Sequence, residues 1–352
     1  MGASRGNAQA TAQAVAQHQS SGGATFQYQG KTIKTGHSLH PALDPAFGGK
    51  RMSMKPKDKS DKTLISAVLA VDVTGSNADA AEKITNDMPQ IHGLWDYLIP
   101  DEFHPNLQVI AIDDYYDGHF SAPLQISQFE ADLSVMTKWV ERLWPVGGGA
   151  GNGREAYDAA LWASVYQDEL EIWNDGRKGI FILMFDEMPY DRVLASRLRE
   201  VYRNRVLGSI SDGELSDNMK RPSADLLDSA AFQDMSIESL VEKVKEKYSL
   251  WGVMCTESSN YGEQFKTDCF NRWSGLIGKE RMVKMEDASD LSELATALIA
   301  RTAGASKNTI MSALQSGNTA SSSGLRTIDA ALYSVSAASI VSAPKAATLK
   351  RL

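Results

Sequence analysis

The sequence predicts an α/β protein with a doubly wound, mostly parallel central sheet, helices on both faces and flexible tails at both ends. The first observation is a set of short, almost wholly apolar runs, such as Leu64–Val71 and Ile180–Phe185. Such runs are typical of parallel strands that are covered on both faces. The second observation is that segments with apolar residues every three or four positions separate the runs, which indicates amphipathic helices. Because parallel neighbours need crossovers, this alternation favours the doubly wound class.

The elements are predicted in chain order from residue 63. The expected strands are 64–71, 107–112, 180–185, 250–255 and an edge strand at 281–285; the expected helices are 84–98, 129–143, 156–166, 237–248 and 289–301. Alanines at every third or fourth position give helix 156–166 a small-residue face for close packing on a sheet. The polar segment 191–235 is predicted to contain broken helices and loops.

Three parts are expected in the 352-residue chain. Residues 1–62 are predicted to be a disordered, basic tail and linker with a small hairpin near residues 26–33, residues 63–302 the folded domain, and residues 303–352 a Ser/Ala-rich tail. The first part carries nine Lys/Arg and three Asp, a net charge of +6, and the last part carries five Lys/Arg and one Asp, a net charge of +4. Because the whole chain has a net charge of −8, the domain carries −18. Phosphate binding needs clustered cations, so we expect the domain not to bind nucleic acid, and such a partner stays open only for the basic tails.

Cysteine usage and hydropathy predict a cytoplasmic protein with no membrane partner. Cys255 and Cys269 have neither metal-ligand spacing nor a disulfide-rich pattern, so we expect two reduced thiols. No apolar run approaches the roughly eighteen residues that a membrane span requires. Residues 1–23 lack the apolar core of a secretory signal.

Three loops next to these elements carry oxygen-bearing side chains. Asp72-Val73-Thr74-Gly75-Ser76 follows the first strand, a glycine-rich loop at 147–153 precedes helix 156–166, and Asp186 follows the third strand. Open α/β sheets bind ligands at the carboxyl ends of their strands, so we expect these side chains to lie together. Oxygen donors with few charges suit hard cations such as Mg²⁺. The predicted metal ligands are Asp72, Thr74, Ser76, Asn152 and Asp186.

Residues 63–301 resemble the von Willebrand factor type A family, in its intracellular bacterial and alpha-kinase-associated branch. The metal-ion-dependent adhesion site of that family reads Asp-x-Ser-x-Ser, then a Thr or Asp in a glycine-bearing loop, then an Asp after a later strand. DVTGS at 72–76 and FDEMP around Asp186 match the first and third elements. The glycine loop resembles the second element but has no Thr or Asp there, and Asn152 is its nearest oxygen donor.

The resemblance implies a site for Mg²⁺, or for Mn²⁺ or Ca²⁺ in its place. Asp72, Thr74 and Ser76 would bind the ion directly or through water, and Asp186 through water. A partner protein presenting Asp or Glu would complete the coordination, so the chain would be a non-enzymatic adaptor. Members of this branch often act beside AAA+ ATPases of the MoxR type or beside protein kinases. Two alternatives stay open: a metal-assisted hydrolase or phosphotransfer enzyme, and a structural protein acting through its basic tails.

Simpler roles are expected for other polar residues. Asp, Thr and Ser at a strand–helix junction are also favoured helix caps. Glu155 is predicted to lie in the first turn of its helix, where it favours the helix dipole. Asp113 and Asp114 are predicted to form a solvated loop edge. The six histidines contain neither a zinc-spaced pair nor part of a Ser/His/Asp order, so no catalytic residue is predicted.

Overall fold

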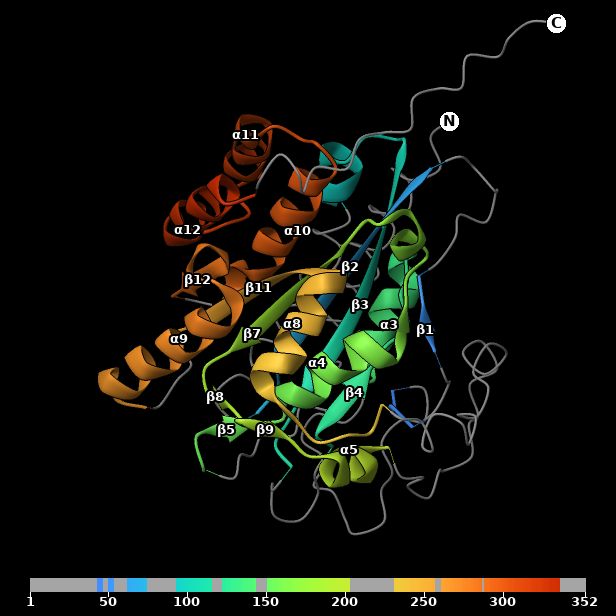
Figure 1. Cartoon of the computed structure of the whole chain (residues 1–352). Helices are drawn as coiled ribbons and strands as arrows, with labels where there is room; N and C mark the ends of the chain where they lie inside the picture. The colour runs from blue at the N-terminus through green and yellow to red at the C-terminus, as the bar shows by residue number, and fades with distance from the viewer. Residues whose placement is uncertain are drawn as a thin grey trace, which may run out of the picture.

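A six-stranded sheet forms the centre of the protein (Figure 1). The computed structural model describes residues 43–46, 50–53, 62–74, 93–115, 122–143, 151–202, 231–256, 261–286 and 288–335. The strand order is β12-β11-β7-β2-β3-β4, and every neighbouring pair is parallel except β3 and β4. The strands are β2 (Thr63–Asp72), β3 (Phe103–Ile112), β4 (Leu124–Ile126), β7 (Gly179–Phe185), β11 (Tyr248–Cys255) and β12 (Met282–Met285). The predicted α/β class with a mostly parallel sheet is confirmed.

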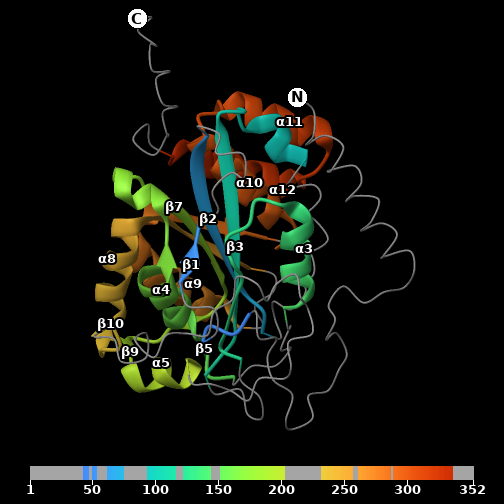
Figure 2. The ribbon, with the colours of Figure 1, turned by 90° about the vertical axis from the view of Figure 1, so that its right-hand side faces the viewer.

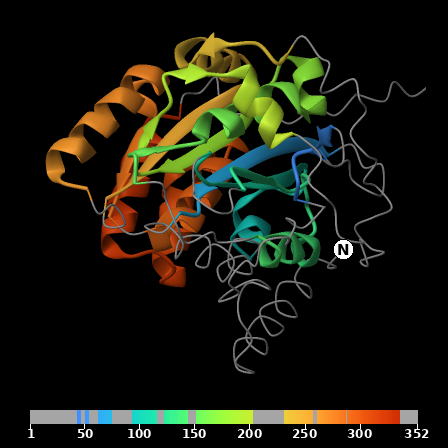
Figure 3. The ribbon, with the colours of Figure 1, turned by 90° about the horizontal axis from the view of Figure 1, so that it is seen from below.

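Helices cover both faces of this sheet (Figures 2 and 3). One face packs against α4 (Tyr157–Tyr166), α8 (Ile237–Lys247) and α9 (Glu263–Ile277). The opposite face packs against a helix at 93–98, α3 (Leu133–Glu141) and α10 (Leu291–Thr302). Strand β2 lies between these layers with all ten residues buried, which explains its apolar sequence.

The strand order places β2 between β3 and β7. From β2 the chain crosses to β3 on one side and returns later to β7 on the other side. Ligands of open α/β sheets bind where the order reverses in this way. The loops that follow β2, β3 and β7 therefore start next to one another at the carboxyl edge of the sheet.

The boundary predicted at residue 303 is wrong, because two further helices follow α10. They are α11 (Lys307–Gly317) and α12 (Ser322–Tyr333), and both bury apolar side chains in the core that α10 forms. The serines that suggested a tail begin these helices. The hydroxyl of Ser306 accepts a hydrogen bond from the Thr309 amide, and the hydroxyl of Ser321 accepts one from the Gly324 amide.

Part of the predicted N-terminal linker is also built into the fold. Leu43 is fully buried, and β1 (Arg51–Met52) pairs in parallel with β6 (Asp168–Glu169). The buried Arg51 guanidinium donates to the Asp44 carbonyl oxygen at 3.1 Å. The hairpin predicted near residues 26–33 lies outside the described residues.

Short elements connect the main ones. They are β5 (Arg154–Glu155), β8 (Met188–Pro189), β9 (Arg192–Val193), β10 (Met235–Ser236), α5 (Ala195–Val201) and the 3-10 turns η1 (Glu171–Asp175), η2 (Lys279–Arg281) and η3 (Ala288–Asp290). The helix α5 agrees with the broken helices predicted for segment 191–235, of which residues 203–230 lie outside the described part. Of the helices in the described ranges, none has the length and apolar character that a membrane crossing requires.

Candidate metal site

Two of the predicted ligands, Asp72 and Asp186, meet at the carboxyl edge of the sheet. Asp72 ends β2 and Asp186 follows β7, and these strands are paired neighbours. The side chain of Asp186 hydrogen-bonds that of Asp72. Both side chains are fully buried. Two carboxyl groups from distant parts of the sequence therefore share one water-poor space.

The Asp72 carboxyl group is held by three donors. Its Oδ1 accepts from the Thr74 amide at 2.9 Å and from the Thr74 hydroxyl at 2.6 Å. Its Oδ2 accepts from the Tyr157 hydroxyl at 2.6 Å. Burial raises the pKa of Asp72, and these hydrogen bonds lower it in part. Thr74 thus lies beside Asp72, as predicted, whereas Ser76 lies outside the described residues.

Asn152 makes a different set of contacts. Its side-chain amide donates to Asp114 Oδ2 at 2.7 Å and to the Tyr190 hydroxyl at 3.3 Å. Its carbonyl oxygen accepts from the Arg154 amide at 2.7 Å. None of these contacts joins Asn152 to Asp72 or to Asp186. Asn152 therefore reaches the acidic edge through Asp114, and no hydrogen bond joins it to Asp72 or Asp186 within the described ranges.

Glu155 supplies a buried oxygen from the same loop. It is only 1% exposed, and its Oε2 has no hydrogen-bond partner among the described residues. Burial, followed by repulsion from Asp72, raises the pKa of Glu155 to about 11. The expected helix-dipole position is wrong, because α4 begins at Tyr157 and Glu155 lies on the preceding strand β5. That strand pairs with β8, just after Asp186, and the charges of Asp72, Glu187 and Asp114 act on Glu155.

Three further acidic side chains line the same edge. Asp113 and Asp114 are fully buried, so the solvated loop edge predicted for them is wrong. They follow β3, whose last residue pairs with Asp72, and the Asp113 carbonyl oxygen accepts from the Ala156 amide at 3.1 Å. The start of the segment that leads into α4 therefore lies against Asp113. Glu187 is 7% exposed, and burial raises its pKa to about 7.

Aromatic side chains enclose this acidic edge on the side of α9. The ring of Tyr157 packs against those of Trp273 and Phe185. The Trp273 indole donates to the Glu187 carbonyl oxygen at 3.0 Å, and the Tyr261 hydroxyl donates to Glu187 Oε1 at 2.9 Å. Rings of this size exclude water, and charges interact more strongly where water is excluded.

Gly153 allows α9 to approach the glycine-rich loop. Its φ of +71° lies in the left-handed region, and a Cβ placed there would lie 3.1 Å from the Phe265 ring. The Gly153 carbonyl oxygen accepts from the Met188 amide at 3.1 Å. Glycine therefore meets both the backbone and the packing requirement of this position.

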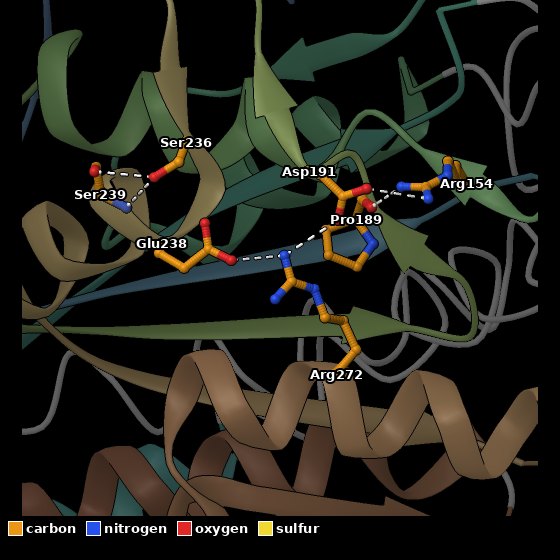
Figure 4. A network of polar contacts seen from close by, with 7 residues as sticks. All are labelled: Arg154, Pro189, Asp191, Ser236, Glu238, Ser239 and Arg272. Atoms are coloured by element: carbon orange, nitrogen blue, oxygen red, sulfur yellow. Dashed lines mark hydrogen bonds and ion pairs between the residues drawn. The ribbon is translucent and has the colours of Figure 1, made fainter.

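A rim of polar contacts braces the loops outside the acidic edge (Figure 4). Arg154 donates to the Pro189 carbonyl oxygen at 2.6 Å and lies 3.3 Å from an Asp191 carboxylate oxygen. From α9, Arg272 reaches Asp191 at 3.2 Å and Glu238 at 2.7 Å. These contacts join β5, the β8–β9 turn, α8 and α9.

The oxygen donors at the edge suit a hard divalent cation. Within the described ranges, no three Asp, Glu, His or Cys side chains converge closely enough to hold a metal ion by themselves. A site of the predicted type needs fewer carboxylates, because hydroxyl groups such as that of Thr74 supply the remaining oxygens. A buried carboxylate oxygen without a partner, as at Glu155, is costly unless a cation or a proton neutralises it. Carboxyl and hydroxyl oxygens are the donor types that Mg²⁺, Mn²⁺ and Ca²⁺ prefer.

No protein-family model matches this sequence, and no curated protein matches it. Two similar solved structures are both of the pilus adhesin SpaC from Lactobacillus rhamnosus GG. The open conformation is 14% identical with a TM-score of 0.40, and a second form is 13% identical with the same TM-score. Each likeness covers 72% of this chain and 31% of the adhesin, so the chain spans about a third of that protein's length. A likeness this distant indicates neither family nor function.

Proposed function

We propose that this protein is a metal-dependent protein-binding module of the von Willebrand factor type A kind. A divalent cation held by Asp72, Thr74 and Asp186 would capture an acidic side chain of a partner protein, and the chain would act as an adaptor in the cytoplasm rather than as an enzyme. The observation that supports this function is the meeting of Asp72 with Asp186 at the ends of neighbouring strands.

Glu155 is the residue that we propose for the second loop of the site, where its side chain would have to move to join Asp72 and Asp186, because no three acidic side chains converge on one point within the described ranges. The family pattern places an oxygen ligand in that loop, and the carbonyl oxygen of Asn152 is already used by the Arg154 amide. The unpartnered Oε2 of Glu155 lies among the other carboxyl groups. A bound cation favours ionised ligands, so Glu155 would release its proton when the ion binds.

The charge of the site determines how strongly a partner would be held. Asp72, Asp186 and an ionised Glu155 together exceed the charge of one divalent ion. A partner's carboxylate would then be attracted less strongly than by an ion with two carboxylate ligands. We therefore expect weak, reversible capture. A MoxR-type AAA+ ATPase or a protein kinase remains a candidate partner on the sequence resemblance alone.

Calorimetric titration with Mg²⁺, Mn²⁺ and Ca²⁺ tests the cation site. The variant Asp72→Asn keeps the size of the side chain and removes its charge, so we expect the affinity to fall by at least about 100-fold. Asp96→Asn is the matched control, because Asp96 is exposed on the helix at 93–98. Wild-type protein that binds none of the three ions, or Asp72→Asn that binds as tightly as the control, would contradict the proposal.

Capture of a carboxylate needs its own readout. In the Mn²⁺-loaded protein, the relaxation rate of water protons reports the waters on the ion. Acetate stands in for the partner side chain, and we expect it to displace water and lower this relaxation enhancement. If the cation is fully enclosed, acetate will leave the relaxation enhancement unchanged. That result would reject the adaptor function but not the cation site.

A metal-assisted hydrolase is a second candidate, which the raised pKa of Glu187 favours. A carboxyl group with a pKa of about 7 can donate or accept a proton near neutral pH, as general acid–base chemistry requires. Incubation with Mg²⁺ and a generic phosphoester tests this function. Turnover in wild type that is lost in Asp72→Asn would replace the adaptor function with an enzymatic one.

A further inference from the structure

A second surface, far from the acidic edge in the strand order, has the character of a binding groove. It lies beside β12, the strand at one end of the sheet, where α12 packs against that strand (Figure 1). The groove has a volume of about 390 Å³, within the range of ligand pockets. Its apolar lining includes Trp251, Met282 and Ala330, and its charged lining includes Lys279, Lys284 and Arg326.

The cations of this groove have no carboxylate partner in the described part of the chain. Lys279, Lys284 and Arg326 are exposed, and none of them forms an ion pair with another described residue. Cations elsewhere in the described ranges do form such pairs; they include Arg154, Arg177, Arg192, Lys245, Lys266, Arg272 and Lys307. The whole chain has a net charge of −8. Three exposed cations around one groove, of which Lys284 lies 4.4 Å from the centre of the Phe270 ring, therefore form a basic surface on an acidic protein.

Neighbouring residues shape the apolar part of the groove. The Arg281 guanidinium lies 4.7 Å from the centre of the Trp251 ring, and Glu280, an acidic lining residue, interacts with that guanidinium. Three cations and the single carboxylate Glu280 line the groove, so its net charge is positive. Trp251 itself is only 2% exposed, so the packing around its ring holds the ring in place.

The edge of the sheet is not open for the addition of a strand. Helix α12 lies against β12, and the Thr327 hydroxyl reaches the Lys284 carbonyl oxygen at 3.5 Å. A helix that covers an edge strand in this way blocks pairing with another chain. A ligand in the groove would therefore be recognised through its side chains and charge.

We propose that this groove binds an acidic peptide segment of a partner protein. Carboxylates of the segment would pair with Lys279, Lys284 and Arg326, while one apolar side chain would fill the space beside Met282 and Ala330. The tails of this chain are unsuitable occupants, because residues 1–42 and 336–352 contain Lys and Arg and no Asp or Glu. An acidic partner segment has the complementary charge.

Fluorescence anisotropy with a labelled peptide tests this inference. The probe is a peptide of Asp and Glu with a single Leu, and its control replaces every Asp and Glu by Asn and Gln. In the double variant Lys284→Glu/Arg326→Glu we expect at least a tenfold loss of affinity for the acidic probe. A second variant, Ala330→Trp, fills the apolar part of the groove without a change of charge. We expect it to weaken binding of the acidic probe as well.

The control variant Lys62→Glu/Lys243→Glu makes the same change of net charge at exposed positions elsewhere. We expect it to bind the acidic probe within twofold of wild type. Equal losses in the two double variants would overturn the inference, because net charge alone would then govern binding. It would also be overturned by a single-stranded DNA oligonucleotide that binds more tightly than the acidic peptide, or by dimerisation of wild type that the groove variant abolishes.

Discussion

The carboxyl edge of the sheet and the groove beside β12 both gather side chains of one charge, but they do so in opposite surroundings. At the edge, Asp72, Asp114 and Asp186 are fully buried among aromatic rings. At the groove, Lys284 and Arg326 are exposed to solvent. Like charges repel strongly in a buried space and only weakly in water.

The difference indicates two kinds of binding surface. Buried carboxyl groups lower the stability of the fold unless a cation or protons neutralise them, so the acidic edge is coupled to folding. Exposed cations cost little, so the groove can bind or release a partner without affecting the fold. We therefore expect substitutions at the acidic edge to alter the stability of the fold. Substitutions at the groove should alter only the affinity for its partner.

The largest effect is expected for Glu155→Gln in metal-free protein. The pKa of this carboxyl group is about 11 in the folded state and about 4.5 when the chain is unfolded. The folded state therefore holds a proton that the unfolded state releases. This contribution to stability is complete below pH 4.5 and is lost steadily as the pH rises toward 11. At pH 7 the loss is about 3 kcal/mol, and Gln, which needs no proton, should recover it.

Urea unfolding at pH 5, 7 and 9 measures this effect. Wild type should lose stability with rising pH, and the slope should be smaller in Glu155→Gln. The same variant should bind Mg²⁺ at least tenfold more weakly, because an amide adds no charge. The groove variant Lys284→Glu/Arg326→Glu serves as the comparison and should keep the slope of wild type. A more stable variant with unchanged affinity for Mg²⁺ would remove Glu155 from the metal site.

A smaller effect is expected when Mg²⁺ is added to wild type. A ligand at about 100 times its dissociation constant stabilises the folded state by about 2.7 kcal/mol. A thermal melt should therefore shift upward with Mg²⁺ in wild type and in the groove variant, and should not shift in Asp72→Asn. An equal shift in Asp72→Asn would mean that the ion acts elsewhere on the protein.

The smallest effect is expected at the rim, for Arg272→Gln. Arg272 pairs with Asp191 and Glu238, whose side chains are 62% and 54% exposed. Ion pairs in such surroundings contribute less than about 1 kcal/mol to stability. Urea unfolding should show a change of that size, and Mg²⁺ affinity should stay within twofold of wild type. A loss of several kcal/mol in the free energy of unfolding would mean that the rim ion pairs contribute as much to stability as the buried groups of the edge.

Most of the sheet could be predicted because its strands are apolar on both faces. The runs at β2, β3, β7 and β11 have no other simple interpretation. Helix α9 was not predicted, because its buried residues are few and begin only at its seventh position; they are Cys269, Trp273, Leu276 and Ile277. Helices α11 and α12 bury few large side chains and contain many Ser and Ala, a composition that resembles a tail.

At the candidate site, the sequence predicts the residues that follow strands more reliably than those in loops. Asp72 and Asp186 could be placed together because each directly ends or follows an apolar run. Asp113 follows β3 in the same way, and the strand-end argument alone would have placed it at the edge. Glu155 could not be predicted, because its burial depends on the pairing of β5 with β8, which no local pattern indicates.

The buried position of Arg51 determines how many N-terminal residues can be removed from this protein. Burial lowers the pKa of Arg51 to about 10, and its charge offsets part of the raised pKa of the buried Asp168. A chain that started at residue 63 would lose this cation and would leave Asp168 in an apolar interior with Gln108 and Tyr248 as its hydrogen-bond donors. A truncated protein for biochemical work should therefore begin no later than Leu43.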